Sequence, residues 1–210
     1  MLTVYAIPVS LYCAKLRILL RHKNLEWREQ LPPGGYGSEE YKLIVPSGNL
    51  PALVEGDLIL ADSEAIAEYL NEKHPLPPML PRDPARRAKV RERSRFHDTR
   101  LEPALRKLFP HLEKEKRDTA VNDQQSTKLT ALLEQFGRLL SVDDKHALNL
   151  DDCGFAVTFI WIDLLTSELD LKISWPQAVL DYRRKLDDFA AVAEELSEYR
   201  PRLVEYVGSL

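Results

Sequence analysis

A proline-rich segment divides this chain of 210 residues into two unequal parts. Residues 74–84 read HPLPPMLPRDP, with five prolines in eleven positions. Proline lacks a backbone N–H donor and has a fixed φ, so such a run can form neither a helix interior nor a central strand. We therefore expect a stiff linker over residues 76–84, with one domain over residues 1–75 and another over residues 85–210.

The part before the linker alternates between strand-like and helix-like stretches. Residues 2–7 are β-branched and aromatic, which is typical of a strand, and residues 11–22 carry apolar side chains at helical spacing. The remaining expected elements are a second strand, a hairpin of two strands and a second helix, over residues 25–31, 51–54, 58–60 and 65–70. This order, β-α-β and then β-β-α, is that of a thioredoxin-like domain.

The part after the linker has the periodicity of helices throughout. Asp83-Pro84 is a typical helix start, because Asp can cap the helix and Pro at an early position loses a donor that would be unused. Pro103 predicts a kink or a break in this first helix. Further helices are expected over residues 126–140, 187–199 and 202–207.

The most apolar stretch of the chain, LNLDDCGFAVTFIWIDLL, covers residues 148–165. Asn149 can cap a helix here, Asp152 can reach back to it in a capping box, and Leu148 and Cys153 can form a hydrophobic staple. A helix that is apolar on nearly all sides lies at the centre of a bundle. The sequence therefore predicts an α/β domain followed by an all-α helical bundle.

Charge and cysteine content exclude several classes of protein. The formal net charge is −4 with both signs mixed along the chain, which argues against a nucleic-acid-binding protein. Cys13 and Cys153 do not form a disulfide framework, and no paired Cys/His spacing indicates a metal site, so we expect a reducing compartment. No stretch of about 18 apolar residues and no signal peptide is visible, so we expect neither a membrane span nor secretion.

The turn between the first strand and the first helix carries a candidate catalytic group. Ser10 directly precedes the helix, where free backbone N–H groups and the helix dipole favour an anion by roughly 0.3–1 kcal/mol. A hydroxyl here can donate a hydrogen bond to a bound thiolate and lower the pKa of that thiol. Ser10 and Cys13 have the spacing of a C-x-x-C redox motif with serine in first place. Two simpler interpretations remain open, in which Ser10 only caps the helix and Cys13 is a small buried residue.

Two further segments could bind a peptide-like ligand. Pro51 follows a loop and begins a strand, and a cis Leu50-Pro51 bond would leave the Leu50 N–H and C=O free to pair with an extended ligand. Asp62 and Ser63 stand at the next helix start, where either can be a plain N-cap. They could also bind the amino-acid end of a ligand, with Ser63 at its carboxylate and Asp62 at its ammonium group.

These segments, in this order, resemble the glutathione transferase superfamily, in its serine-type, bacterial-like classes. The resemblance rests on KLR at 15–17, VPSGNLPAL at 45–53, ADSEAIAEYL at 61–70, the proline-rich linker, and NLDDCGFAV at 149–157. It implies a thioredoxin-like glutathione-binding domain, a helical domain that shapes the second-substrate pocket, and a cytoplasmic homodimer. Glutathione would be the co-substrate, with no metal, in a detoxification reaction.

The resemblance also implies a role for each candidate residue. Ser10 would activate the glutathione thiol. Leu50 would pair with the cysteinyl part of glutathione, with Pro51 in cis. Asp62 and Ser63 would hold the γ-glutamyl end.

Some positions depart from the family pattern. Asn49 stands where members often carry Lys or Gln near the glycyl carboxylate, and it is shorter and uncharged. The linker and PARRAKVRE at 84–92 are similar to the zeta class, which includes maleylacetoacetate isomerase, but Ser-Leu-Tyr at 10–12 replaces the Ser-Ser-Cys of that class. The leading expectation is a transferase acting on an electrophilic small molecule. The alternatives are a glutathione-dependent isomerase of the maleylacetoacetate or maleylpyruvate type, a non-catalytic interaction protein, and thiol-disulfide exchange.

Two groups of residues could border a second-substrate pocket. Tyr36, in a glycine-rich loop, is either a lid residue or part of an ordinary exposed loop. Arg93, His97 and Arg100, on the first helix after the linker, either line that pocket or form a solvated charged face.

Overall fold

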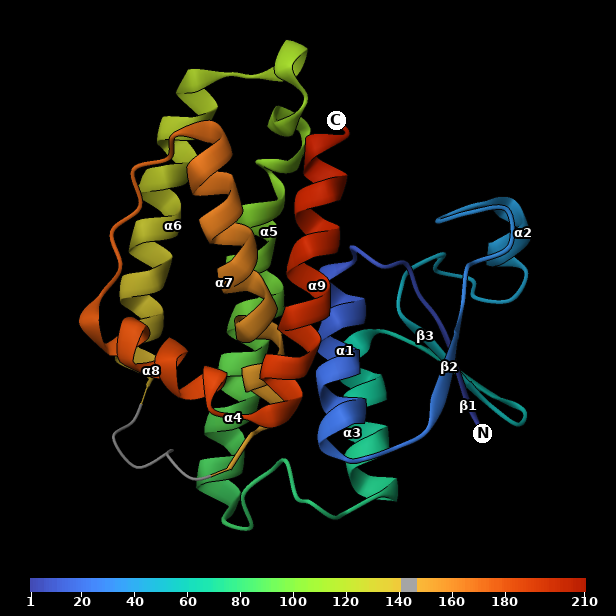
Figure 1. The fold of residues 1–210 in the computed structure, drawn as a ribbon. Helices are drawn as coiled ribbons and strands as arrows, with labels where there is room; N and C mark the ends of the chain where they lie inside the picture. The colour runs from blue at the N-terminus through green and yellow to red at the C-terminus, as the bar shows by residue number, and fades with distance from the viewer. Residues whose placement is uncertain (141–146) are drawn as a thin grey trace.

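The computed structural model describes residues 1–140 and 147–210, and it pairs a four-stranded sheet with a bundle of helices (Figure 1). The strands lie in the order β2-β1-β3-β4, with bounds β1 Leu2–Tyr5, β2 Trp27–Gln30, β3 Ala52–Glu55 and β4 Leu58–Ala61. β1 and β2 are parallel, whereas β3 is antiparallel to both β1 and β4. This mixed sheet with its helices confirms the thioredoxin-like arrangement.

Helix α1 (Leu11–His22) has the bounds that its sequence indicates. It begins after Ser10, whose Oγ accepts a hydrogen bond from the Cys13 N–H at 3.3 Å. α1 and α3 (Ser63–Lys73) lie between the sheet and the helical bundle (Figure 1), and α1 packs against α7 and α9 of that bundle. The helix that follows Ser10 is therefore fixed between the two halves of the molecule.

The segments between these elements have conformations that a few local residues determine. The short helix α2 (Glu39–Lys42) is capped by Ser38. Gly56 makes the turn between β3 and β4 with φ of 58°, a left-handed conformation that glycine adopts without strain. The Leu50-Pro51 peptide bond is cis, as expected from its position at the start of β3.

The rest of the chain is helical (Figure 1). Its elements are α4 Pro84–Phe96, η1 His97–Leu101, α5 Glu102–Arg106, η2 Phe109–Leu112, η3 Lys114–Lys116, α6 Thr119–Leu139, α7 Leu150–Leu169, α8 Gln177–Asp187 and α9 Ala190–Gly208. η1 is a wide π-type turn, so the irregularity expected at Pro103 begins earlier, at His97, and Pro103 itself fits into the first turn of α5. Among the described residues, no helix combines the length and the apolar character that crossing a membrane requires.

Two sequence-based helix bounds are wrong. α6 begins at Thr119 rather than at residue 126, because Asp118 accepts hydrogen bonds from the N–H groups of Ala120 and Val121 and starts the helix seven residues earlier. α9 does not break near Pro201. Its buried face continues past that residue, so packing outweighs the single backbone hydrogen bond that proline removes.

The central helix is α7, which is buried over most of its length. The Asp152 carboxylate accepts a hydrogen bond from the Asn149 N–H at 2.7 Å, as a capping box requires. Leu148 and Cys153 are both buried at the same end of the helix. α7 contacts α1 and α4, so the two halves of the molecule share one continuous core.

Candidate active site

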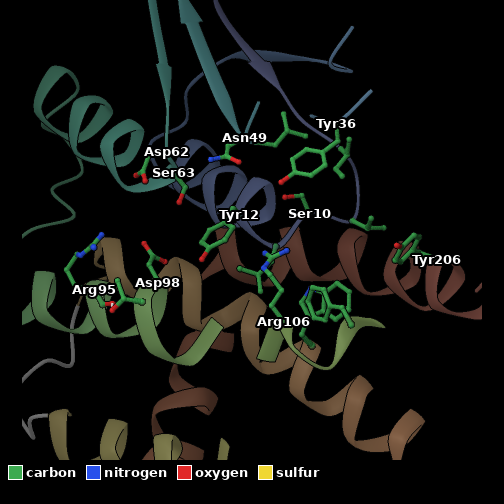
Figure 2. Close-up of a pocket in the computed structure, with 17 residues that line it drawn as sticks. Ser10, Tyr12, Tyr36, Asn49, Asp62, Ser63, Arg95, Asp98, Arg106 and Tyr206 are labelled. Atoms are coloured by element: carbon green, nitrogen blue, oxygen red, sulfur yellow. The ribbon is translucent and has the colours of Figure 1, made fainter. Parts of the chain in front are cut away.

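A cavity of about 600 Å³ opens where the sheet half meets the helical half (Figure 2). We call it the Ser10 cavity. Its walls come from the turn before α1, from the loops that precede β3 and α3, and from α4, η1, α5, η2, α7 and α9. The residues that line it are Ile7, Val9, Ser10, Leu11, Tyr12, Tyr36, Asn49, Leu50, Asp62, Ser63, Arg95, Asp98, Thr99, Arg106, Phe109, Trp161 and Tyr206.

The structure brings five of the six candidate residues together in this cavity. These five are Ser10, Asn49, Leu50, Asp62 and Ser63. Pro51 does not line the cavity and contributes only through its cis bond to Leu50. Residues that are up to 53 positions apart in the sequence therefore line the same cavity. Their separate local motifs could not show this proximity.

The Ser10 hydroxyl lies on the cavity wall while its oxygen takes part in capping α1. The oxygen accepts the Cys13 N–H at 3.3 Å, and the hydroxyl also lowers the pKa of the nearby Cys13 thiol. Rotation of the hydroxyl can point the O–H into the cavity at the N-terminus of α1, where the helix dipole favours negative charge. Figure 2 shows Ser10 between Tyr12 and Tyr36 at the cavity wall.

Side chains distant in sequence position the turn that carries Ser10. The Arg17 guanidinium donates to the carbonyls of Ile7 and Pro8, at 3.2 and 3.4 Å. The Tyr199 hydroxyl, from α9, donates to the Val9 carbonyl at 2.8 Å. Three successive carbonyls of the turn thus have fixed partners, so Ser10 is held in place before any ligand arrives.

Cys13 is not a group of this cavity. Its side chain is 1% exposed and does not line the wall. Burial raises the pKa of the Cys13 thiol, and the Ser10 hydrogen bond and the Arg17 charge offset this only in part. A buried, protonated thiol is a poor nucleophile, so the geometry gives no support to thiol-disulfide exchange.

Asp62 has an unusual backbone conformation at the edge of the cavity. Its backbone φ is 97°. Residues other than glycine adopt this region at a cost of about 1–3 kcal/mol, and they do so mostly at functional sites. Oδ1 of Asp62 accepts the N–H groups of Glu64 and Ala65, at 2.9 and 3.1 Å. Oδ2 remains available to a cationic ligand group, and Ser63, 7% exposed, lies beside it.

A buried charge network lies behind these two residues. Lys15, which is 2% exposed, donates to Glu64 at 2.8 Å and to Asp98 at 3.0 Å. His97 contacts Asp98 through Nδ1 at 2.6 Å and Thr158 through Nε2 at 2.7 Å. Burial alone would raise the pKa of Asp98, but the His97 hydrogen bond and the Lys15 charge outweigh it and lower the pKa to about 2. Asp98 therefore presents an ionised carboxylate to the cavity at neutral pH.

Gly154 of α7 makes room for this network. An added Cβ would lie 2.8 Å from the His97 ring, which its two hydrogen bonds hold in place. We expect Gly154→Ala to lower the free energy of unfolding by about 1–3 kcal/mol through overpacking. Urea denaturation measures this change.

Gly137 of α6 is the matched control for that substitution. An added Cβ there would meet its nearest neighbour, a methyl carbon of Val179, at an ordinary 3.6 Å. Gly137→Ala should raise stability by up to about 1 kcal/mol, because alanine has the higher helix propensity. Equal effects of the two substitutions would contradict the steric argument at Gly154.

The wall from the helical half carries aromatic rings and the guanidinium group of Arg106. Phe109 and Trp161 stack with ring centroids 4.3 Å apart. The Arg106 guanidinium lies 5.9 Å from the ring centroid of Tyr12 and 5.3 Å from that of Phe109. Burial and the nearby carboxylates, Glu102 first, raise the pKa of Tyr12, so its phenol is protonated. No local motif in the sequence marks Arg106, Phe109 or Trp161 as cavity residues.

The structure also corrects the expected charged face of the first helix after the linker. Arg93 and His97 are 2% and 1% exposed, and Arg93 pairs with Asp151 at 2.6 Å inside the bundle. Arg100 lines a different hollow of the surface. Tyr36 does reach the Ser10 cavity, although its side chain is largely exposed.

The N-terminal part of the sequence matches a known protein family. Residues 4–78 match the family model of the glutathione S-transferase N-terminal domain. Residues 4–78 therefore form a glutathione S-transferase N-terminal domain. The resemblance seen in the sequence is thereby confirmed.

Curated relatives match the chain over part of their own length. A stringent starvation protein A homolog of Histophilus somni is 36% identical over 90 residues, which are 43% of this chain and 42% of the relative. Glutathione S-transferase Z1 of Arabidopsis thaliana is 46% identical over 81 residues, 36% of each chain. The matched segment thus spans about two fifths of these relatives.

Solved glutathione transferase structures share the fold over the whole chain. A delta-class glutathione transferase of Nilaparvata lugens has a TM-score of 0.84 at 20% identity, covering 100% of this chain and 99% of that chain. A maleyl pyruvate isomerase, a bacterial zeta-class protein, has a TM-score of 0.75 at 22% identity, covering 92% and 95%. The helical half therefore belongs to the same architecture as the matched N-terminal half. No cluster of metal-binding side chains occurs among the residues that the structure describes.

Proposed function

We propose that this protein is a glutathione transferase, which activates the thiol of glutathione for attack on an electrophilic small molecule. The observation that carries the proposal is the position of the Ser10 hydroxyl, at the N-terminus of α1 and on the wall of the Ser10 cavity. Donated to sulfur, this hydrogen bond favours the thiolate over the thiol. The thiolate then forms the S–C bond while the leaving group departs with its electron pair, and the thiol proton passes to solvent.

The remaining candidate residues would bind the rest of glutathione. Asp62, through its free Oδ2, would receive the γ-glutamyl ammonium group, and Ser63 its carboxylate. Leu50 would pair its backbone with the cysteinyl part. Asn49 would lie near the glycyl end, where an uncharged side chain gives a weaker contact to a carboxylate than a lysine would.

A second candidate function is glutathione-dependent isomerisation. Arg95 and Arg106 both line the Ser10 cavity, and guanidinium groups favour a substrate that carries a carboxylate. Two similar proteins, glutathione S-transferase Z1 of Arabidopsis thaliana and the zeta-class maleyl pyruvate isomerase, make this class relevant. Isomerisation returns the thiol unchanged, so the consumption of glutathione during turnover separates the two functions.

A non-catalytic interaction protein is the third possibility, because stringent starvation protein A homologs are among the similar proteins. The available hydroxyl of Ser10 within a cavity supports the enzyme over this alternative. As part of the same proposal we retain a glutathione-binding domain over residues 1–75, a linker over 76–84 and a helical domain over 85–210. A cytoplasmic homodimer also belongs to the proposal.

Isothermal titration with reduced glutathione tests where the ligand binds. The double substitution Asp62→Ala and Ser63→Ala should weaken binding by about tenfold or more, because hydrogen bonds to charged groups are lost. Asp83→Ala is the control, since Asp83 caps α4 away from the Ser10 cavity and its loss removes a cap without touching the proposed site. Unchanged affinity in the double variant, or no binding by the folded wild type, would refute the proposed site.

A further inference from the structure

A second hollow of the surface lies between α5 and α6, on the other side of η1 from the Ser10 cavity. It has a volume of about 880 Å³ and is lined by Thr99, Arg100, Pro103, Ala104, Lys107, Gln124, Gln125, Thr127, Lys128, Ala131, Leu132 and Gln135. We call it the α5–α6 groove. Thr99 lines both hollows, so the two are neighbours, and no other residue is common to their linings.

The charge of the α5–α6 groove is of one sign. Arg100, Lys107 and Lys128 line it, and its lining contains no carboxylate. None of these three side chains forms an ion pair within the described ranges 1–140 and 147–210, whereas Arg106, on the same helix as the groove wall, is paired with Glu102. Three unneutralised positive groups around one concave surface create a local positive potential on a chain whose net charge is −4.

The three cations come from two facing walls of the groove. Arg100 and Lys107 are seven residues apart, about two turns along the η1–α5 wall, and Lys128 stands on the facing wall of α6. Ala104 and Leu132, both buried, form the floor between the walls. A small ligand in the groove can therefore be met by positive charge from both sides.

Gln125 provides an independent sign of a missing ligand. Its side chain is 5% exposed and lines the groove, and its Oε1 has no hydrogen-bond partner among the residues that the structure describes. A buried amide oxygen without a partner is unfavourable, and a half-turn of the amide would place its NH₂ at that position, where it can donate to an anion. Gln124 and Gln135 add two further amides to the same wall.

We propose that the α5–α6 groove binds a small polyanion with two or three oxyanion groups, phosphoryl or carboxylate. Arg100, Lys107 and Lys128 supply the charge, and Gln125 supplies a buried hydrogen bond. The volume is that of a small-molecule site. This site is separate from the one that the proposed function uses, and it does not depend on glutathione binding.

Isothermal titration of the whole protein with two probes, sodium tripolyphosphate and tricarballylate, tests the site. The wild type should bind at least one probe at one equivalent per chain, less tightly as salt is added. Tighter binding of tripolyphosphate would identify a phosphoryl ligand, and tighter binding of tricarballylate would identify a carboxylate ligand. Reduced glutathione should leave the affinity unchanged.

Substitutions then locate the bound probe. Arg100→Gln, Lys107→Gln and Lys128→Gln should each weaken binding by about tenfold, and Gln125→Leu should weaken it without a change of charge. Lys185→Gln is the matched control, because Lys185 is exposed on α8, forms no ion pair in the described part of the chain and lies outside the groove. Circular dichroism confirms that each variant is folded.

Three results would overturn the proposal. The first is that the folded wild type binds neither probe. The second is that a variant with Arg100→Gln, Lys107→Gln and Lys128→Gln together binds the probe as tightly as the wild type, or that Lys185→Gln alone weakens binding as much as that triple variant does. The third is that the glutamine variants change the sedimentation coefficient while the wild type binds neither probe, which would make the groove a contact between copies of the chain.

Discussion

Replacing Ser10 with alanine should lower kcat/KM for glutathione conjugation by about ten- to a hundredfold at pH 7. The reason is the loss of a hydrogen bond to a charged sulfur, which contributes about 1.5–3 kcal/mol. The pKa of the bound glutathione thiol should rise by about one to two units, and the ultraviolet absorbance of the thiolate against pH measures it. Glutathione affinity should change little, because Asp62 and Ser63 are intact.

The substitution at Ser10 also removes an N-cap, which costs about 1 kcal/mol of stability. Asp118→Ala is the matched control, because Asp118 caps α6 far from the Ser10 cavity. It should show a similar loss of stability and unchanged kcat/KM. If Ser10→Ala kept its full activity across several classes of electrophile, Ser10 would not be the activating group.

Glu195→Gln should lower the free energy of unfolding by about 3–5 kcal/mol, the usual result of breaking a buried ion pair. Glu195 is fully buried on α9 and pairs with Arg17 and Arg21 of α1, each at 3.1 Å. Without its charge, the buried Arg17 guanidinium keeps Glu29 as its one acidic partner among the residues that the structure describes. Urea denaturation measures the loss.

Glu194→Gln is the control for this substitution. Glu194 also pairs with Arg21, but its side chain is 59% exposed, so the pair contributes less than about 1 kcal/mol. If both variants lowered the free energy of unfolding equally, burial would not explain the contribution of the Glu195 ion pairs to stability. The Glu195 variant should also lose conjugation activity, because Arg17 fixes the carbonyls that precede Ser10.

Local motifs predicted the parts of the candidate site that a few neighbouring residues determine. The cap of Ser10 on α1, the cis Leu50-Pro51 bond, the cap of Asp62 on α3 and the capping box of Asn149 each depend on side chains within three residues. The α6 start was missed although Asp118 supplied a capping signal, because the polar first turns of that helix show no apolar stripe.

The sequence by itself determined the order of the elements in the N-terminal half and the starts of α1, α3, α4 and α7, and it singled out the candidate residues Ser10, Leu50, Asp62 and Ser63. These features follow from hydrogen bonds and hydrophobic periodicity that act over a few residues. Only the tertiary structure decided that Arg106 and Trp161 complete the Ser10 cavity, and that Lys15 is buried between Glu64 and Asp98. Such contacts join residues 49 and 83 positions apart, and the packing of α1 between the sheet and the bundle, rather than any local pattern, brings them together.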